Sequence, residues 1–166
     1  MPMRRRCSII VSTLALLLAG CGSGTYAMKE VPFAAPTPPG PGETLIYVFR
    51  EDSAFGAARK LAVIDNDTVV AVLTPGTFSH FTVSTGEHEI VGYISPSPVM
   101  HYRVTPSHGT TVYLFCKMGY ASGMFIQVMD EATARPLISR FKYTEIDVKG
   151  AKAKMDYKAY YDQLYK

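Results

Sequence analysis

The residues of this chain that could act as acids, bases or metal ligands are its four histidines. They are His80, His88, His101 and His108. Their spacing matches neither the His-x-His pattern nor the HExxH pattern, each of which brings two imidazoles to one side of an element. We expect His80 and His88 in or beside strands, and His101 and His108 near loops. The spacing therefore predicts no metal site and no catalytic histidine.

Two short segments come close to motifs that carry chemistry, and both depart from them. Ser122 lies within Gly119–Gly123, but a nucleophile elbow needs glycine two residues before the serine, where this chain has Tyr120. Asp65 and Asp67 begin like a calcium-binding loop, but the glycine and glutamate that such a loop needs do not follow. We therefore expect no catalytic residue. A hydrolase with an unrecognised site is the remaining enzymatic alternative.

The charge of the chain does not favour nucleic-acid binding. Arg4, Arg5 and Arg6 carry three positive charges, which equal the whole formal net charge of +3. The rest of the chain is therefore neutral, whereas nucleic-acid-binding domains present a basic surface. We expect no nucleic-acid partner.

The first 21 residues have the layout of an export signal. The arginines are followed by the apolar stretch Ile9–Leu18, which is too short for a hydrocarbon core that takes about 20 residues to span. A signal peptide is therefore indicated, and a permanent transmembrane helix is not. The stretch ends in Leu18-Ala19-Gly20-Cys21.

Leu18, Ala19, Gly20 and Cys21 resemble the lipobox of bacterial lipoproteins. The resemblance implies cleavage between Gly20 and Cys21, with a diacylglycerol on the Cys21 sulfur and an acyl chain on the freed amino group. Apart from this covalent lipid, no cofactor is expected. Several acyl chains together make a durable membrane anchor, whereas one alone binds marginally. An ordinary signal peptide cut elsewhere is the alternative.

The position after the lipid-bearing cysteine bears on location. Enterobacterial lipoproteins that stay at the inner membrane carry Asp there, and this chain has Gly22. The resemblance therefore implies a cell-envelope protein anchored to the membrane, with the periplasmic face of the outer membrane favoured. The mature chain would then retain Cys21 and Cys116. Cys116 lies in the apolar run Val112–Cys116, so we expect it to be a buried small side chain.

The composition divides the chain into four parts. Residues 1–20 are the signal peptide, 21–43 the acylated cysteine and a tether rich in proline and glycine, 44–146 a β-domain, and 147–166 a helical segment rich in tyrosine and lysine. Proline removes backbone donors, so we expect the tether to be a semi-extended spacer. The alternative is that Val31–Phe33 docks on the domain or on the membrane.

The β-domain is predicted from short runs rich in valine, isoleucine, threonine and aromatic residues, separated by turn residues. The runs are Leu45–Phe49, Lys60–Ile64, Thr68–Leu73, Thr77–Val83, His88–Ile94, Thr111–Lys117 and Phe125–Met129, with Leu137–Tyr143 as a weaker eighth. Asp65-Asn66-Asp67 reads as a tight hairpin. Because no long helical pattern interrupts the runs, the expected fold is mainly β: an antiparallel β-sandwich of about seven or eight strands, or an open barrel.

Several of these segments resemble an uncharacterised family of bacterial lipoproteins with small, PEGA-like β-domains. The resemblance rests on Tyr47–Arg50, Ala62–Asp65, Val69–Leu73, Pro75–Phe78 and Thr85–Ile90. It implies a β-sandwich on a lipid anchor and supplies no activity.

Residues 147–166 end the chain with an amphipathic pattern. Apolar and aromatic residues fall at helical spacing on one side. They are Tyr157, Tyr160, Tyr161, Leu164 and Tyr165. A helix this short needs a surface to pack on. That surface is the chain's own domain, an envelope protein partner or a membrane interface, and the sequence leaves all three open.

Together these features predict a non-enzymatic, lipid-anchored envelope protein with a binding or scaffolding β-domain. The first alternative is a binder of small ligands or glycans. It would use the connection Ser95–Gly109 and side chains expected to be exposed, namely Tyr93, Tyr102 and Tyr120.

Overall fold

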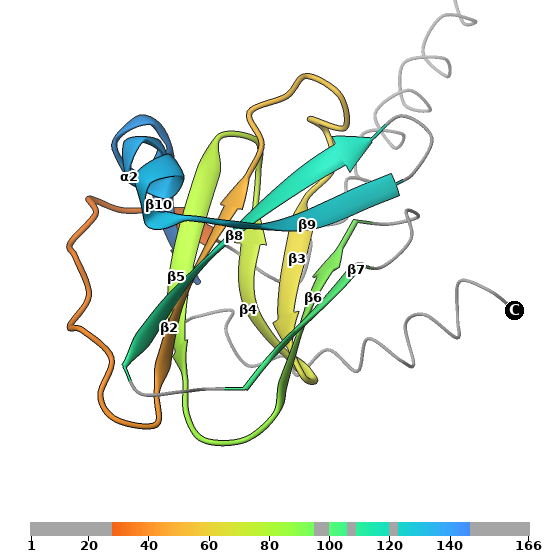
Figure 1. Cartoon of the computed structure of the whole chain (residues 1–166). Coiled ribbons are helices and arrows are strands. Elements are labelled where there is room, and N and C mark those ends of the chain that lie inside the picture. The colour runs from red at the N-terminus through yellow and green to blue at the C-terminus, as the bar shows by residue number, and fades with distance from the viewer. Residues whose placement is uncertain (1–27, 95–99, 106–108, 120–122, 147–166) are drawn as a thin grey trace, which may run out of the picture.

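The structure, a computed structural model, describes residues 28–94, 100–105, 109–119 and 123–146 (Figure 1). In chain order the elements are β1 (Met28–Glu30), β2 (Thr44–Arg50), β3 (Leu61–Asp65), β4 (Thr68–Leu73), β5 (Thr77–Val83), β6 (His88–Tyr93), β7 (Met100–Val104), β8 (Thr110–Gly119), β9 (Gly123–Met129), α2 (Glu131–Arg140) and β10 (Lys142–Ile146). Within these ranges, no helix has the length and apolar character needed to cross a membrane.

The strands form two sheets. The larger has the order β1-β10-β5-β2-β8-β9 and the smaller the order β4-β3-β6-β7. Neighbours are antiparallel except for β2 with β8 and β10 with β5, which are parallel. The prediction of a mainly β sandwich is confirmed, but its sheets are mostly and not wholly antiparallel, and the described residues form ten strands instead of the seven or eight expected.

The core between the sheets follows from the alternation of side chains along each strand. From β2, Ile46 and Val48 point inward and meet Leu61 and Val63 of β3. The expected hairpin at Asp65-Asn66-Asp67 joins β3 to β4, with Asn66 in the left-handed region at φ 54°. Asparagine adopts this conformation more readily than most residues.

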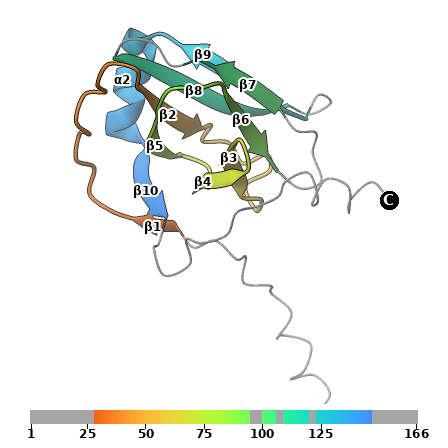
Figure 2. The same cartoon turned by 90° about the horizontal axis from the view of Figure 1, so that it is seen from below.

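A second apolar cluster lies on the opposite face of the six-stranded sheet. Its ring-bearing members include Phe33, Tyr47, Phe49, Phe78, Tyr113 and Tyr143, here called the outer aromatic cluster. Helix α2 covers this face through Ala134, Leu137 and Ile138, and Figure 2 shows the helix on the side of the large sheet away from β3 and β4. The helix therefore covers a second apolar core on this face of the large sheet.

Helix α2 corrects the prediction of a weak eighth strand over Leu137–Tyr143. The Asp130 side chain accepts a hydrogen bond from the backbone N–H of Thr133 at 2.8 Å, which caps the first turn. Arg135 pairs with Glu131 one turn earlier. The helix ends at Arg140, and the strand begins only at Lys142, as β10.

The tether is also corrected where the structure describes it. Strand β1 pairs antiparallel with β10, in the register Met28 to Ile146 and Glu30 to Thr144. Phe33 then packs edge-on against Phe78 and Tyr143, each at 5.3 Å between ring centroids. The prediction of a passive spacer is wrong for residues 28–33. Residues 28–30 pair with β10, and Val31 and Phe33 pack against the outer aromatic cluster. The docking alternative for Val31–Phe33 is confirmed for the domain.

The connection Ser95–Gly109 is shorter than expected, because β7 lies within it and pairs with β6. His101 is on this strand and not near a loop. Tyr102 and Val104 alternate with polar residues and face the core, which explains why the segment forms a strand. Tyr93 is 6% exposed, so its expected exposure is wrong. Residues 95–99, 106–108 and Tyr120 lie outside the described part.

Candidate functional site

The site residues predicted for lipidation and for partner binding lie outside the described residues. These are the lipobox residues Leu18, Ala19, Gly20 and Cys21 and the side chains Tyr157, Tyr160, Tyr161, Leu164 and Tyr165. Lipidation at Cys21 and docking by the C-terminal segment therefore remain predictions. His108 and Ser122 also lie outside the described residues.

The three described histidines lie apart and have different partners. His88 Nδ1 lies 2.7 Å from Asp65 Oδ1, and His101 Nδ1 lies 3.0 Å from Glu89 Oε1, both on the four-stranded sheet. His80 lies on β5 of the other sheet. Over the described ranges, no three histidine, cysteine or acidic side chains are grouped so that they could hold a metal ion.

His80 is part of a hydrogen-bonded chain at the margin of the outer aromatic cluster. Its ring stacks on Tyr143 at 5.1 Å between centroids and 9° between planes. The Tyr143 hydroxyl donates to Glu145 Oε1 at 3.0 Å, so the His80 Nε2–H donates to the phenol oxygen, also at 3.0 Å. Burial raises the pKa of Tyr143, and its bond to the Glu145 carboxylate raises that pKa further. The phenol therefore stays protonated, and the chain of bonds is suited to fixing β10 on β5.

The titration of His80 gives a test of this arrangement. Burial lowers the pKa of His80 below 6.5, and the negative charge of Glu145 opposes that shift. The unfolded chain therefore binds the proton more tightly, so this residue makes the fold less stable as the pH falls below about 6.5. Imidazole NMR signals should show His80 titrating below pH 6.5, and lower still in Glu145→Gln. A pKa above 6.5 in the native chain would contradict the burial of this ring.

Cys116 is buried and lies in the core between the sheets, as expected from its apolar run. Burial raises the pKa of the thiol to about 12, and the nearby charge of Arg50 opposes this only in part. The thiolate is the reactive form of cysteine. The structure therefore places Cys116 as a packing residue.

The reactivity of Cys116 can be measured in a mature chain carrying Cys21→Ser, where it is the remaining thiol. We expect no labelling by a thiol reagent at pH 8 in the folded protein, and full labelling in denaturant. Fast labelling of the folded protein would show that the core opens readily at β8.

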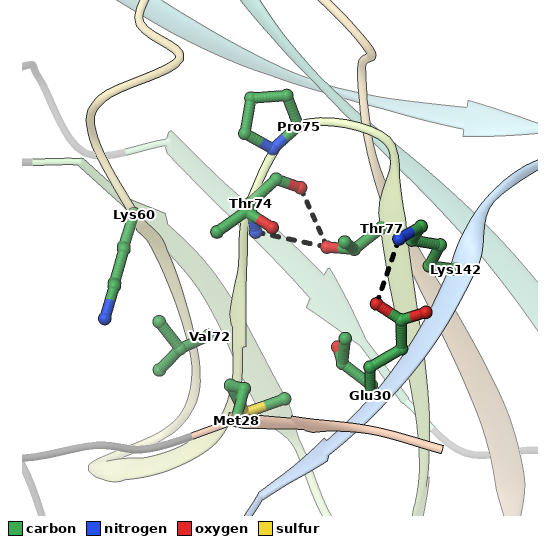
Figure 3. A pocket seen from close by; sticks show the side chains of 9 residues that line it. Met28, Glu30, Lys60, Val72, Thr74, Pro75, Thr77 and Lys142 are labelled. Carbon is green, nitrogen blue, oxygen red and sulfur yellow. Dashed lines mark hydrogen bonds and ion pairs between the residues drawn. The ribbon is translucent and has the colours of Figure 1, made fainter. Parts of the chain in front are cut away.

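The described part contains a cavity of about 410 Å³ at the corner where the two sheets approach (Figure 3). It is lined by Met28, Glu30, Lys60, Val72, Thr74, Pro75, Thr77, Lys142 and Thr144. Lys142 Nζ lies 3.2 Å from Glu30 Oε2. In Figure 3 this pair and Lys60 lie on opposite sides of Val72 and Thr74.

The lining combines apolar side chains with two lysines, of which Lys142 is paired with the Glu30 carboxylate. Met28 and Val72 supply the apolar surface. The Thr77 hydroxyl donates to the Thr74 carbonyl at 2.8 Å and accepts from the Thr74 backbone N–H at 3.1 Å. These two bonds stabilise the turn between β4 and β5. A small molecule with an apolar body and an anionic group would suit this lining.

Sequence reasoning missed this cavity. Its residues come from β1, β4, β5 and β10 and from the residues beside them, so no single motif contains them. In the sequence, the cavity is marked only by lysines next to apolar strand residues, at Lys60 and Lys142, and this pattern is too common to predict a site.

Comparison of the chain with family models, with curated proteins and with solved structures found no match.

Proposed function

We propose that this chain is a lipid-anchored cell-envelope protein whose β-sandwich is a non-enzymatic binding or scaffolding domain. In this proposal Cys21 carries the lipid, and the domain faces the periplasm, with the outer membrane favoured. The observation that carries the proposal is the lipobox Leu18-Ala19-Gly20-Cys21, and the position of β1 supports a domain held close to it. The chain joins the large sheet at Met28, shortly after the lipobox cysteine.

The pairing of β1 limits how far the domain can lie from its anchor. Only residues 22–27 separate Cys21 from Met28. A fully extended chain spans at most about 3.5 Å per residue, so this stretch reaches about 25 Å. An anchored domain would therefore stay close to the membrane surface. That supports a role among membrane-bound components, such as holding an envelope protein in place.

The candidate chemical groups in the described residues are engaged with other side chains or buried, which is consistent with a structural role for them. His88 and His101 contact carboxylates, and His80 is bonded within a structural chain of side chains. Cys116 is buried with a raised pKa. Packing and side-chain pairing therefore explain why these residues occupy their positions, without a catalytic role.

An in-cell crosslinking experiment tests the proposal. The full-length protein would be crosslinked and recovered from membrane and soluble fractions, beside a Cys21→Ala variant. We expect the native protein in the membrane fraction with a discrete envelope protein attached, and the variant released from the membrane. Equal membrane recovery of both forms would refute the anchor. Saturable turnover of any substrate by the purified domain, abolished by a His80 or His88 substitution, would refute the non-enzymatic role.

The cavity at the sheet corner favours a second candidate function, the binding of a small ligand or glycan. The site differs from the expected one, because Tyr93 is buried and β7 occupies much of the Ser95–Gly109 connection. The ligand would place an anionic group near Lys60, on the side away from the Glu30–Lys142 ion pair, and an apolar part over Met28 and Val72.

Thermal unfolding tests this second candidate, because a ligand that binds the folded state raises its stability by mass action. Peptidoglycan fragments and acidic sugars would be added to the native chain and to a Lys60→Ala, Lys142→Ala variant. A rise in melting temperature in the native chain alone would support the cavity. Arg103→Ala, an exposed substitution on β7, is the matched control and should behave like the native chain.

A further inference from the structure

The four-stranded sheet has an apolar outer face in addition to the side that faces the core. Along β3, β4 and β6, one set of side chains joins the core shared with the larger sheet, as Val63, Ala71 and Ile90 do. Their neighbours in sequence point to the opposite side. This second set is Ile64, Val69, Val72, Val91 and Tyr93, here called the outer apolar face.

The outer apolar face is buried, and few apolar side chains of the described residues pack against it. Ile64 and Val91 are 0% exposed, and the other three are also buried. Within the described ranges, the partly buried apolar side chains that pack against it are Met28 and Ala62. Ala62 belongs to β3 itself, and Met28 borders the face from β1. Among apolar side chains of the described residues, only these two therefore pack on the face, and both lie at its margin or on its own strands.

We propose that residues 147–166 pack on the outer apolar face and cover it with Tyr157, Tyr160, Tyr161, Leu164 and Tyr165. The point at which this segment begins supports the proposal. It follows directly after β10, whose last residue, Ile146, is paired with Met28. Because Met28 contacts the outer apolar face, the segment starts at the border of the surface that it would cover.

The dimensions and chemistry also fit. Residues 151–166 would make a helix about 24 Å long at 1.5 Å per residue, and a six-residue strand such as β4 spans about 20 Å. Aromatic rings give large apolar contact areas, and the tyrosine hydroxyls can reach water at the margin of the face. In the mature chain, the N-terminal segment 22–27 holds only one large side chain, Tyr26. The apolar stretch Ile9–Leu18 competes only in a chain that keeps its signal peptide.

Cysteine protection tests the proposal in the full mature chain. Val69→Cys places a thiol on the outer apolar face, and Cys21→Ser removes the lipid-bearing thiol. We expect the introduced thiol to react with a maleimide at least about tenfold more slowly than it does when all four of Tyr157, Tyr160, Tyr161 and Tyr165 are replaced by serine. The matched control replaces Lys152, Lys154 and Lys158 of the same segment by glutamine and should keep the protection.

Two results would overturn the proposal. Equal protection with and without the tyrosines would mean that another segment covers the face. Fast labelling in both forms, with protection appearing only on addition of lipid vesicles or of a captured envelope protein, would assign the face to a membrane or to a partner. Buried Cys116 serves as the internal reference, because its labelling would reveal an unfolded variant.

A photo-crosslinker that replaces Tyr161 in the otherwise native segment keeps the test decisive if the serine variant unfolds. Crosslinks to peptides that contain residues 62–72 or 90–93 are the expected result. Crosslinks confined to helix α2 or to β9 would overturn the proposal. Because the lipid anchor is absent from these chains, failure here leaves the proposed anchorage unaffected.

Discussion

Replacing Arg50 by methionine is expected to lower the free energy of unfolding by about 3 kcal/mol. Arg50 is 2% exposed and ends β2. Its guanidinium donates to the backbone carbonyls of Leu73 at 2.7 Å and Gly56 at 2.8 Å, and also to that of Arg59. These bonds tie the connection between β2 and β3 to the end of β4. Methionine fills similar space but leaves the three carbonyls without this donor.

The cost comes mainly from the bond to the Leu73 carbonyl, which is buried, because a buried carbonyl that loses its donor cannot regain water; the bonds to Gly56 and Arg59 are part-buried. Burial lowers the pKa of Arg50 to about 10, so the side chain stays charged at neutral pH. Arg50→Lys should also destabilise, since an ammonium lacks the planar fork that reaches several acceptors. Urea unfolding measures both. Arg103→Met, at an exposed site, should change little, and an equally small change at Arg50 would contradict this account.

Replacing Phe78 by alanine is expected to destabilise the fold by about 3–5 kcal/mol, the range for deleting a buried aromatic ring. Phe78 is fully buried in the outer aromatic cluster. Its ring lies 5.2 Å from that of Phe49 and 5.3 Å from those of Phe33 and Tyr143. It therefore contacts β2, β10 and the segment that follows β1, and its loss would leave a void beneath all three.

Denaturant unfolding of Phe78→Ala checks this expectation, with Phe125→Ala as the control. Phe125 is 39% exposed on β9 at the edge of the large sheet, so its truncation should cost much less. If the two variants lost similar stability, the outer aromatic cluster would not be the second core described above. Loss of the Phe33 contact should also loosen residues 31–33, which hydrogen exchange can detect.

Strands with strong local signals were predictable from the sequence. Leu45–Phe49 is apolar throughout because β2 lies in the middle of the large sheet and is buried on both faces. The hairpin at Asn66 was marked by turn residues that tolerate a positive φ. Both signals are carried by neighbouring residues, so they can be read without knowledge of the tertiary structure.

Elements that depend on distant partners were missed. Met28–Glu30 has no strand pattern of its own and forms β1 only because β10 offers a free edge. Glu131–Arg140 contains Pro136, which disfavours a helix interior, yet the Asp130 cap and the contacts of Leu137 and Ile138 stabilise the helix. The cavity lining was equally hidden, because Met28 and Lys142 meet only in the folded chain.

The mass of the N-terminal peptide of the mature protein tests the central claim most directly. The protein would be purified from cell membranes, digested and analysed by mass spectrometry. We expect a chain that begins at Cys21 and carries a diacylglycerol on sulfur and an acyl group on nitrogen, and we expect this species to vanish in Cys21→Ala. A mature chain that begins elsewhere, or that carries a free thiol at Cys21, would contradict the lipid-anchored role.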